Sequence, residues 1–426
     1  MLDIQFIREN PDQVRTAAQN KQLNPEIVNR VLAVDEKRRQ LIQQVDVLRH
    51  QINTHADQVK TKVQAGQKPT SDQIETGRKL KEELKNIEPE LKQTEAVFTD
   101  LMLQVPNVPA ADVPIGADET GNEVIKTVGE RTKFDFTPLP HHQLMEQLDL
   151  VDTARAVNIG GFRSYFLKNE AVLLEQALLN FALEKMIAHG FTPMTAPVLV
   201  NKAALVGTGY FPWGEEDHYQ TQDEQILAGT SEVALTSYRM NEVLTEKDLP
   251  LMMTAISPCF RREVGSHGKD TQGIIRVHQF NKVEQVVYTI ADEEVTREWH
   301  EKITGISEEL LQELGLPYQV LVMCTGDMGA GQRKKYDIET WFPAQNKYRE
   351  THSSSYFNDF QARRLNIRYQ DKKGELKYVY TMNNTVAATP RLLAAVVENY
   401  QRADGSIAIP QALQKFLPMT EISRSA

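Results

Sequence analysis

Residues 257–284 read SPCFRREVGSHGKDTQGIIRVHQFNKVE, and this stretch decides the predicted fold. Apolar and polar residues alternate at both ends and the middle is polar and rich in glycine, so we predict two antiparallel strands joined by a long loop. The alternation places Arg276, His278 and Phe280 on one face of the second strand. Guanidiniums bind phosphate and an aromatic ring stacks on a base, so this face suits a nucleoside triphosphate. A surface hairpin whose charges pair with one another is the alternative that these residues leave open.

The bulk composition indicates a cytoplasmic protein with more than one domain. A chain of 426 residues, 41% hydrophobic and 25% charged, can hold two or three domains and a large core. Its formal charge of -10 argues against nonspecific attraction to nucleic acid or membrane, so RNA binding would need a local basic patch. The two cysteines, Cys259 and Cys324, fit a reducing compartment, and Cys259 suits a buried thiol better than a nucleophile. We find no secretion signal and no span of the ~20 apolar residues that a membrane helix needs, so we expect no membrane contact.

Residues 26–105 predict two long antiparallel helices, preceded by short helices in residues 1–25. Aliphatic residues recur at coiled-coil spacing in two seams, and residues 65–71, AGQKPTS, predict the reversal between them. Helices of ~38 residues would each be ~57 Å long. Pro89 predicts a kink or two helices placed end to end, because proline removes a backbone donor. The seams contain Leu41, Val45, Leu48, Ile52 and Val59, then Leu80, Leu84, Ile87, Leu91, Phe98, Leu101 and Val105, and His55 interrupts the first.

Basic residues gather in the distal half of this hairpin, although the protein as a whole is acidic. A positive tip favours contact with a phosphate backbone. An oligomerisation device is the alternative for a hairpin of this kind. The basic residues are Arg49, Lys60, Lys62, Lys68, Arg78, Lys79 and Lys81, and they face only Asp57, Asp72 and Glu75.

Three stretches carry a resemblance to a known family. Residues 260–285, FRREVGSHGKDTQGIIRVHQFNKVEQ, resemble motif 2 of the class II aminoacyl-tRNA synthetases in the form found in seryl-tRNA synthetases. Residues 158–201 resemble motif 1, which forms the dimer interface of the family, although the apolar periodicity of this segment alone predicts an ordinary core helix packed through positions such as Leu178 and Ile187. Residues 382–401, MNNTVAATPRLLAAVVENYQ, resemble motif 3.

The resemblance implies an α+β fold with two domains. Residues 1–105 would form an N-terminal tRNA-binding domain, whose antiparallel coiled-coil arm grips the long variable arm of tRNA(Ser). Residues 106–125, which are rich in proline and glycine, would link it to a class II catalytic domain, residues 126–426, built on a mostly antiparallel sheet flanked by helices.

The resemblance also implies a serine-binding site. Residues 230–232, TSE, match the Thr-X-Glu signature, in which a carboxylate holds the substrate ammonium, but the same tripeptide is equally a helix N-cap. Glu284 lies in the apolar strand KVEQVVY, where an unpaired carboxylate would be costly in a core, and this favours a site. The implied serine-binding residues are Thr230, Ser231, Glu232, Arg261, Glu284, Asn383 and Thr385.

An ATP site is implied on the same elements. Arg261 would bridge the serine carboxylate and the α-phosphate, Glu263 would bind the adenine amino edge, and Phe280 would stack on the ring. Arg391 follows Pro390 at a predicted helix start, where the helix dipole favours phosphate. The implied ATP-binding residues are Arg261, Arg262, Glu263, Arg276, Val277, Phe280, Glu350, Thr351, His352, Ser353 and Arg391, with the side chain of Arg262 expected to point away from the nucleotide.

Residues 349–355, RETHSSS, carry the implied metal site. Glu350 and Ser353 match the carboxylate and hydroxyl that hold Mg²⁺ in the family, and Mg²⁺ prefers hard oxygen ligands together with substrate phosphate. For Ser354 and Ser355, a cluster of N-capping hydroxyls is the alternative. Residues 326–331, GDMGAG, lack the GK[ST] ending of a phosphate-binding loop, so we do not assign one there.

The implied activity is two-step ligation of L-serine to tRNA(Ser) with ATP and Mg²⁺, by a homodimer. The selenocysteine tRNA, tRNA(Sec), would be a further substrate in a host that has one. One rival is a relative that charges a carrier protein, against which the basic hairpin argues. Another is a noncatalytic coiled-coil binding protein with an inactive synthetase fold. The residues that argue against it are Arg261, Glu284, Glu350 and Arg391.

Overall fold

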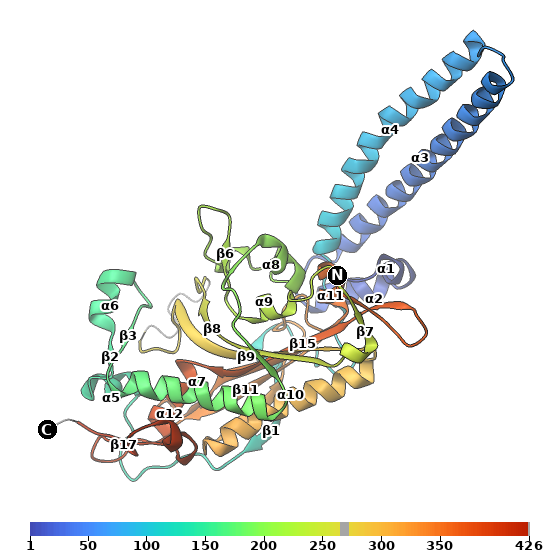
Figure 1. The fold of residues 1–426 in the computed structure, drawn as a ribbon. Coiled ribbons are helices and arrows are strands. Elements are labelled where there is room, and N and C mark those ends of the chain that lie inside the picture. The colour runs from blue at the N-terminus through green and yellow to red at the C-terminus, as the bar shows by residue number, and fades with distance from the viewer. Residues whose placement is uncertain (265–271, 425–426) are drawn as a thin grey trace. The chain divides into compact units, whose positions relative to one another are not determined.

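The computed structural model describes residues 1–264 and 272–424 (Figure 1). These residues form two compact units, one made of residues 2–19 and 23–106 and the other of residue 1, residues 20–22 and residues 107–426. The long loop predicted within residues 257–284 falls partly on residues 265–271, which lie outside the described residues.

The first unit contains the predicted helical hairpin. Short helices α1 (Ile4–Glu9) and α2 (Pro11–Asn20) precede α3 (Glu26–Gln64) and α4 (Ser71–Leu103), which run side by side in Figure 1. The α4 helix starts with a capping box made by Thr70 and Gln73, and Nε2 of His55 in α3 donates a hydrogen bond to the Gln73 carbonyl oxygen (2.8 Å). The hairpin prediction is confirmed, and His55 interrupts the apolar seam to make a polar contact across it. Pro89 lies inside α4, which is one continuous helix, so the alternative of two helices placed end to end is wrong.

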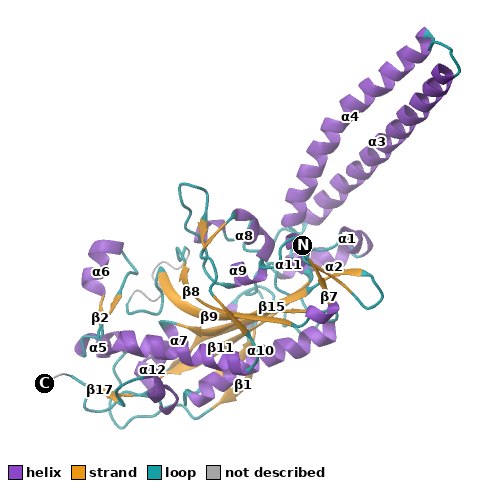
Figure 2. Cartoon of the chain, viewed as in Figure 1, coloured by secondary structure: helices purple, strands orange, loops and turns teal. Residues whose placement is uncertain are grey.

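The second unit is built on an eight-stranded sheet. Its strands are antiparallel neighbours except for the edge pair β4 and β8, so the predicted mostly antiparallel sheet is confirmed (Figure 2). The strand order is β1 (Glu123–Val128), β10 (Tyr318–Val322), β11 (Lys334–Phe342), β12 (Lys347–Asn358), β15 (Tyr380–Ala388), β9 (Gln279–Thr289), β8 (Leu251–Phe260) and β4 (Thr192–Met194).

Helices cover both faces of this sheet, and short strands lie in the connections between the longer elements (Figure 1). The helices are α5 (His141–Gln147), α6 (Thr153–Gly160), α7 (Glu170–Ala188), α8 (Lys202–Thr208), α9 (Glu232–Thr236), α10 (Glu293–Glu313), α11 (Phe360–Leu365) and α12 (Arg391–Asn399). The short strands are β2 (Val151–Asp152), β3 (Phe166–Leu167), β5 (Leu199–Val200), β6 (Ile226–Leu227), β7 (Val243–Thr245), β13 (Arg368–Gln370), β14 (Leu376–Tyr378), β16 (Ile407–Ala408) and β17 (Glu421–Ile422). No helix among the residues that the structure describes combines the length and the apolar character needed to cross a membrane.

Strand alternation sends neighbouring polar side chains to opposite faces of the sheet. Gln285 and Asn384 both donate from their side-chain amides to the Ile303 carbonyl oxygen of α10, at 2.9 and 2.6 Å. Their neighbours Glu284 and Asn383 therefore point to the other face. That face is covered by α9 and α11.

Residues 107–125, which make up all but the first residue of the segment expected to be a linker, belong to the second unit. The side-chain amide of Asn107 donates to the carbonyl oxygens of Gly331 (3.1 Å) and Phe357 (2.9 Å), and the segment continues into edge strand β1. The expected start of the catalytic domain at residue 126 thus lies inside a strand. In α7, Leu178 is buried as predicted, but Ile187 is 50% exposed and Met186 takes its place in the core, so the core prediction for Ile187 is wrong.

Candidate active site

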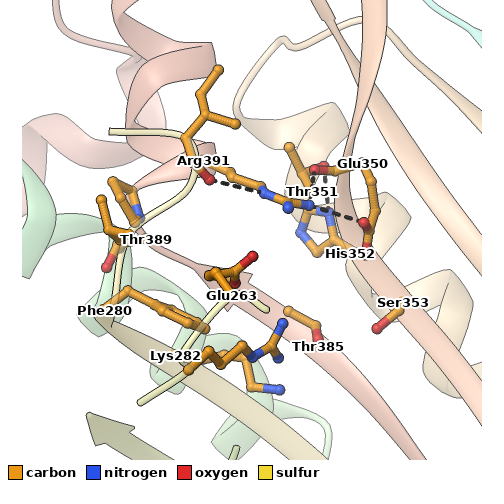
Figure 3. Close-up of a pocket in the computed structure, with 15 residues that line it drawn as sticks. Glu263, Phe280, Lys282, Glu350, Thr351, His352, Ser353, Thr385, Thr389 and Arg391 are labelled. Atoms are coloured by element: carbon orange, nitrogen blue, oxygen red, sulfur yellow. Dashed lines mark hydrogen bonds and ion pairs between the residues drawn. The ribbon is translucent and has the colours of Figure 1, made fainter. Parts of the chain in front are cut away.

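A pocket on the α9 and α11 face of the sheet collects most of the residues expected to bind ATP (Figure 3). Its walls come from the ends of β8 and β9, the middle of β12, the end of β15 and the first residue of α12. Residues more than a hundred positions apart in the chain therefore meet here. The predicted residues that line the pocket are Arg261, Glu263, Val277, Phe280, Glu350, Thr351, His352, Ser353, Thr385 and Arg391.

An irregularity in β12 brings Glu350 and Ser353 to the same face. In a regular strand, residues three positions apart point to opposite faces. Here Glu350 pairs with Glu339 and His352 pairs with Ile338, so Thr351 is an extra residue in β12 and forms a bulge. After the bulge, Ser353 pairs with Asp337, which lies on the same face of β11 as Glu339, so Glu350 and Ser353 both point into the pocket.

Arg391, at the start of α12, forms hydrogen bonds with two other segments of the chain at one end of the pocket. Its Nη1 donates to the carboxylate (2.9 Å) and to the carbonyl oxygen (3.1 Å) of Glu350, and its Nε donates to the Ile275 carbonyl oxygen (3.2 Å). Desolvation opposes ionisation of Glu350, but the charges of Arg391 and Lys335 outweigh it and lower the pKa of Glu350 to about 2. The carboxylate is therefore charged at neutral pH.

The opposite wall carries an aromatic ring beside a guanidinium. The guanidinium carbon of Arg261 lies 5.2 Å from the centroid of the Phe280 ring, and its Nε donates to the Gly229 carbonyl oxygen (3.3 Å). Glu263 has a left-handed backbone conformation (φ 56°), and its carboxylate accepts a bond from Nη1 of Arg276 (2.7 Å). Arg276 does not line the pocket, but its bond to Glu263 connects it to a residue that does.

Arg262 lies outside the pocket. Its backbone N–H donates to the Asp217 carbonyl oxygen (2.9 Å), and its guanidinium donates to the Glu216 carbonyl oxygen (3.0 Å). Its side chain thus points away from the pocket, as expected, and the structure gives no support for counting Arg262 as an ATP-binding residue.

A buried polar cluster continues the pocket toward α9 and α11. The Glu232 carboxylate accepts bonds from the Tyr210 hydroxyl (2.7 Å), the Asn383 amide (3.1 Å) and the Gln361 amide (3.1 Å). The same Asn383 amide donates to Glu284 (3.0 Å). Burial and the nearby Glu284 charge raise the pKa of Glu232 to about 7, so this carboxyl group titrates near neutrality.

Glu284 is fully buried and paired with a cation. Lys282, two residues earlier on β9, forms an ion pair with it, and the Thr385 hydroxyl lies within 3.4 Å. The cluster therefore holds two buried carboxyl groups and one buried ammonium group at the inner end of the pocket. A second cation would be favoured there, because buried charges need opposite charges nearby.

Helix N-capping was an alternative role both for residues 230–232 and for Ser354 and Ser355, and the structure gives a different answer for each. The Thr230 hydroxyl accepts a bond from the Glu232 N–H (3.1 Å), while Ser231, the N-cap residue of α9, makes no side-chain cap bond, so the TSE segment both starts a helix and places Glu232 in the cluster. Ser354 and Ser355 lie within β12, and their hydroxyls accept bonds from Thr304 and Gln332 at 2.8 Å. The N-capping alternative for these two serines is wrong.

Three residues of the cluster were not predicted from the sequence. Lys282 could have been, because its position two residues before Glu284 on one strand places both side chains on the same face. Tyr210 follows α8, and Gln361 lies on α11, more than a hundred residues from Glu232. No local pattern distinguishes these two residues from ordinary loop and helix positions.

Comparison with known proteins finds relatives along the whole chain. Residues 1–109 match the Seryl-tRNA synthetase N-terminal domain, and residues 215–400 match the tRNA synthetase class II core domain (G, H, P, S and T). The chain is 44% identical to the serine–tRNA ligase of Deinococcus radiodurans over 99% of both chains, and 41% identical to that of Pseudothermotoga lettingae over 98% of this chain and 99% of the relative.

Solved structures extend the likeness to the whole fold. Seryl-tRNA synthetase from Pyrococcus horikoshii, crystallised with ATP, superposes with a TM-score of 0.94 at 38% identity and full coverage of both chains. The cytoplasmic enzyme from Naegleria fowleri, crystallised with AMP, gives a TM-score of 0.89 at 30% identity, covering 100% of this chain and 99% of that one. Because relatives this similar align with the chain from end to end, the protein belongs to the seryl-tRNA synthetase family.

Proposed function

We propose that the protein is a serine–tRNA ligase, which activates L-serine with ATP and transfers the seryl group to tRNA(Ser). The observation that carries this proposal is the convergence of Arg261, Glu284, Glu350 and Arg391, from four separate elements, around one pocket and the polar cluster that adjoins it. Full-length similarity to serine–tRNA ligases supports the same activity. The relatives crystallised with ATP and AMP support nucleotide binding at this pocket.

Serine is assigned to the polar cluster. Its ammonium group would lie against Glu232 and supply the second cation that the two carboxyl groups lack. Its hydroxyl would bond Glu284, with Asn383 and Thr385 beside it, and a site that hydrogen-bonds a hydroxyl rejects an analogue without one. Thr230 and Ser231 would shape this end of the site through α9.

ATP is assigned to the open pocket, with its base on Phe280. Glu263 and the backbone at Val277 would contact the adenine edge, Arg261 the α-phosphate, and Arg391 the terminal phosphates, while Arg276 would act through Glu263. The serine carboxylate attacks the α-phosphorus, its oxygen forms a bond to phosphorus, and pyrophosphate leaves. The carboxylate is already ionised, so positioning and neutralisation of phosphate charge by the arginines supply the catalysis. A ribose hydroxyl of the terminal tRNA adenosine then attacks the carbonyl, and AMP leaves.

Mg²⁺ is assigned to Glu350 and Ser353, and the structure offers donors that fit it. The Thr351 bulge directs one ionised carboxylate and one hydroxyl to the same face, and Mg²⁺ completes its shell with phosphate oxygens and water rather than with many protein ligands. When bound, the ion would neutralise charge on the ATP phosphates. Thr351 and His352 complete this wall of the pocket.

The helical hairpin is assigned to tRNA. Its basic side chains are exposed, and the structure pairs Arg49 with Glu88 and Arg78 with Glu75, each at 3.0 Å. Within the described residues no ion pair is recorded for Lys60, Lys62, Lys68, Lys79 or Lys81, which leaves them available for phosphates. We assign residues 1–105 as the tRNA-binding domain, 106–125 as the connection and 126–426 as the catalytic domain, with tRNA(Sec) a further substrate where the host has one.

A homodimer is proposed on the exposed apolar side chains of motif 1. Val172, Leu173 and Ile187 on α7 are 39%, 43% and 50% exposed, and Phe166 on the nearby β3 is 45% exposed. Another subunit that covered these exposed apolar side chains would remove them from water. Both cysteines are buried free thiols, which supports a location in the reducing cytoplasm.

The proposed activity is tested by pyrophosphate exchange with each of the twenty amino acids, followed by aminoacylation of a tRNA(Ser) transcript. We expect serine to give the largest exchange signal and the transcript to be charged. A larger signal with threonine would refute the amino-acid assignment. Serine-dependent exchange without charging of the transcript would favour a carrier-protein substrate instead.

A further inference from the structure

Tyr210 is partly buried and, like Gln361, is a contact of Glu232 that neither strand pattern nor family motif indicates. Its hydroxyl donates to Oε2 of Glu232 at 2.7 Å, the shortest of the bonds to that carboxylate. Asn383 donates to the same oxygen, and Gln361 donates to the other. The amide nitrogens of Asn383 and Gln361 can only donate. The phenol oxygen of Tyr210 donates its proton and still has lone pairs that can accept a hydrogen bond.

The loop that carries Tyr210 is held firmly at both ends. Gly209, which ends α8, has φ 89°, a left-handed conformation that suits glycine, and it turns the chain so that the Tyr210 N–H bonds the Leu205 carbonyl oxygen (3.0 Å). Arg364 of α11 donates to the carbonyl oxygens of Val206 (2.9 Å) and Phe211 (3.1 Å), one on each side of Tyr210. The loop is therefore fixed to the same helix that carries Gln361.

Neighbouring aromatic rings restrict the tyrosine side chain. The imidazole of His218 meets the Tyr210 ring edge-on at 5.7 Å and the Phe211 ring at 5.3 Å, and its Nδ1 bonds the Gly214 carbonyl oxygen (2.8 Å). Arg364 lies over the rings of Trp213 (5.3 Å) and Phe360 (4.5 Å). A phenol restrained in this way can fix the direction of a carboxylate.

We propose that Tyr210 is a positioning residue for amino-acid recognition, which orients the Glu232 carboxylate toward the ammonium group of the substrate. This inference rests on the proposed serine activation and extends it to a residue outside the sequence motifs. The charged groups that face Glu232 are Glu284 and Lys282 from β9, with Arg261 near the tyrosine ring at the end of β8, and the remaining neighbours, Gln361 and Asn383, are neutral. Among the residues that the structure describes, Tyr210 is thus the one whose hydroxyl group bonds the Glu232 carboxylate.

The variant Tyr210→Phe keeps the ring and removes the donor. Because a hydrogen bond to a charged group contributes more binding free energy than a neutral one, we expect KM for serine in pyrophosphate exchange to rise about 10- to 100-fold. KM for ATP should change less than about twofold. Loss of the donor also disfavours the charged carboxylate, so the acidic limb of the kcat/KM profile for serine should move to higher pH by about one unit. Thermal unfolding of the variant shows whether it is folded.

Tyr238→Phe is the matched control, because Tyr238 follows α9 and is 48% exposed. We expect it to leave both KM values and the pH profile unchanged. The inference fails if Tyr210→Phe keeps the serine KM of the unaltered enzyme, if the KM values for serine and ATP rise together, or if the acidic limb stays in place. Failure of the proposed function is distinguishable, because the unaltered protein would then show no serine-dependent exchange at all.

Discussion

Arg391 and Glu350 form an ion pair in which Nη1 of the arginine lies 2.9 Å from Oε2 of the glutamate. The arginine begins α12 and the glutamate lies in the centre of β12, so this pair joins the start of a helix to the strand that carries the proposed metal ligands. The planar guanidinium has further donors that can bind phosphate while it stays beside the carboxylate. The pair therefore holds the phosphate-binding groups in place before ATP arrives.

Arg391→Lys should reduce kcat/KM for ATP in pyrophosphate exchange by about 100-fold, because a lysine keeps the charge but loses the forked donors. KM for serine should change less than about twofold, since the serine cluster lies on other residues. The control is Arg402→Lys, which alters an exposed arginine paired with Glu421 at 2.6 Å and should leave both constants unchanged. Equal losses for serine and ATP would contradict a role confined to the nucleotide.

Glu284→Gln should reduce kcat/KM for serine by about 100-fold, because the neutral amide is a poorer acceptor for the serine hydroxyl and leaves Lys282 without its partner. Protection against thermal unfolding by ATP should persist in this variant and shows that the pocket is intact. Glu375→Gln, at an exposed turn, is the matched control. Retention of serine activation by Glu284→Gln would place the hydroxyl elsewhere.

Local pattern was enough to predict the main helices and strands, whereas the site residues were implied by the family resemblance. Alternation along β9 separates Glu284 from Gln285, and coiled-coil spacing marks Leu41, Val45 and Leu48, because both patterns depend only on the geometry of one strand or helix. The prediction that the distant motifs meet at one site came from the family resemblance, since nothing local to Arg391 indicates that it lies beside Glu350.

Other features depend on pairing between elements and could not be predicted in this way. The Thr351 bulge exists only in the register of β12 against β11, so the sequence RETHSSS gives no sign that Glu350 and Ser353 share a face. Tyr210 and Gln361 reach Glu232 through tertiary packing of α8 and α11. The orientation of Arg262 likewise depends on tertiary contacts, which it makes with the carbonyl oxygens of Glu216 and Asp217.

Serine binding should release a proton at pH 6 and none at pH 8.5. The pKa of Glu232 is raised to about 7 from an ordinary 4.5, by burial and by Glu284, so the empty site is protonated at pH 6, and a bound ammonium favours the charged form. Calorimetric titration in two buffers of different ionisation enthalpy measures this proton. Without serine, the folded protein keeps a proton that the unfolded chain has lost, so this group lowers stability as pH rises from about 4.5 to about 7. Proton uptake at pH 6 would contradict the assignment.

The double variant Lys60→Glu and Lys62→Glu should impair aminoacylation of tRNA(Ser) while leaving pyrophosphate exchange unchanged. Both lysines are exposed on α3 and far along the chain from the pocket residues, so only the tRNA step should respond. The slope of the logarithm of the tRNA binding constant against the logarithm of the salt concentration should become shallower by about one to two. Each lost phosphate contact lowers the magnitude of this slope by about 0.7–0.9. Lys372→Glu with Lys373→Glu, a matched pair of exposed lysines in the catalytic unit, is the control. Equal effects of the two pairs on aminoacylation would indicate bulk charge rather than recognition by the hairpin.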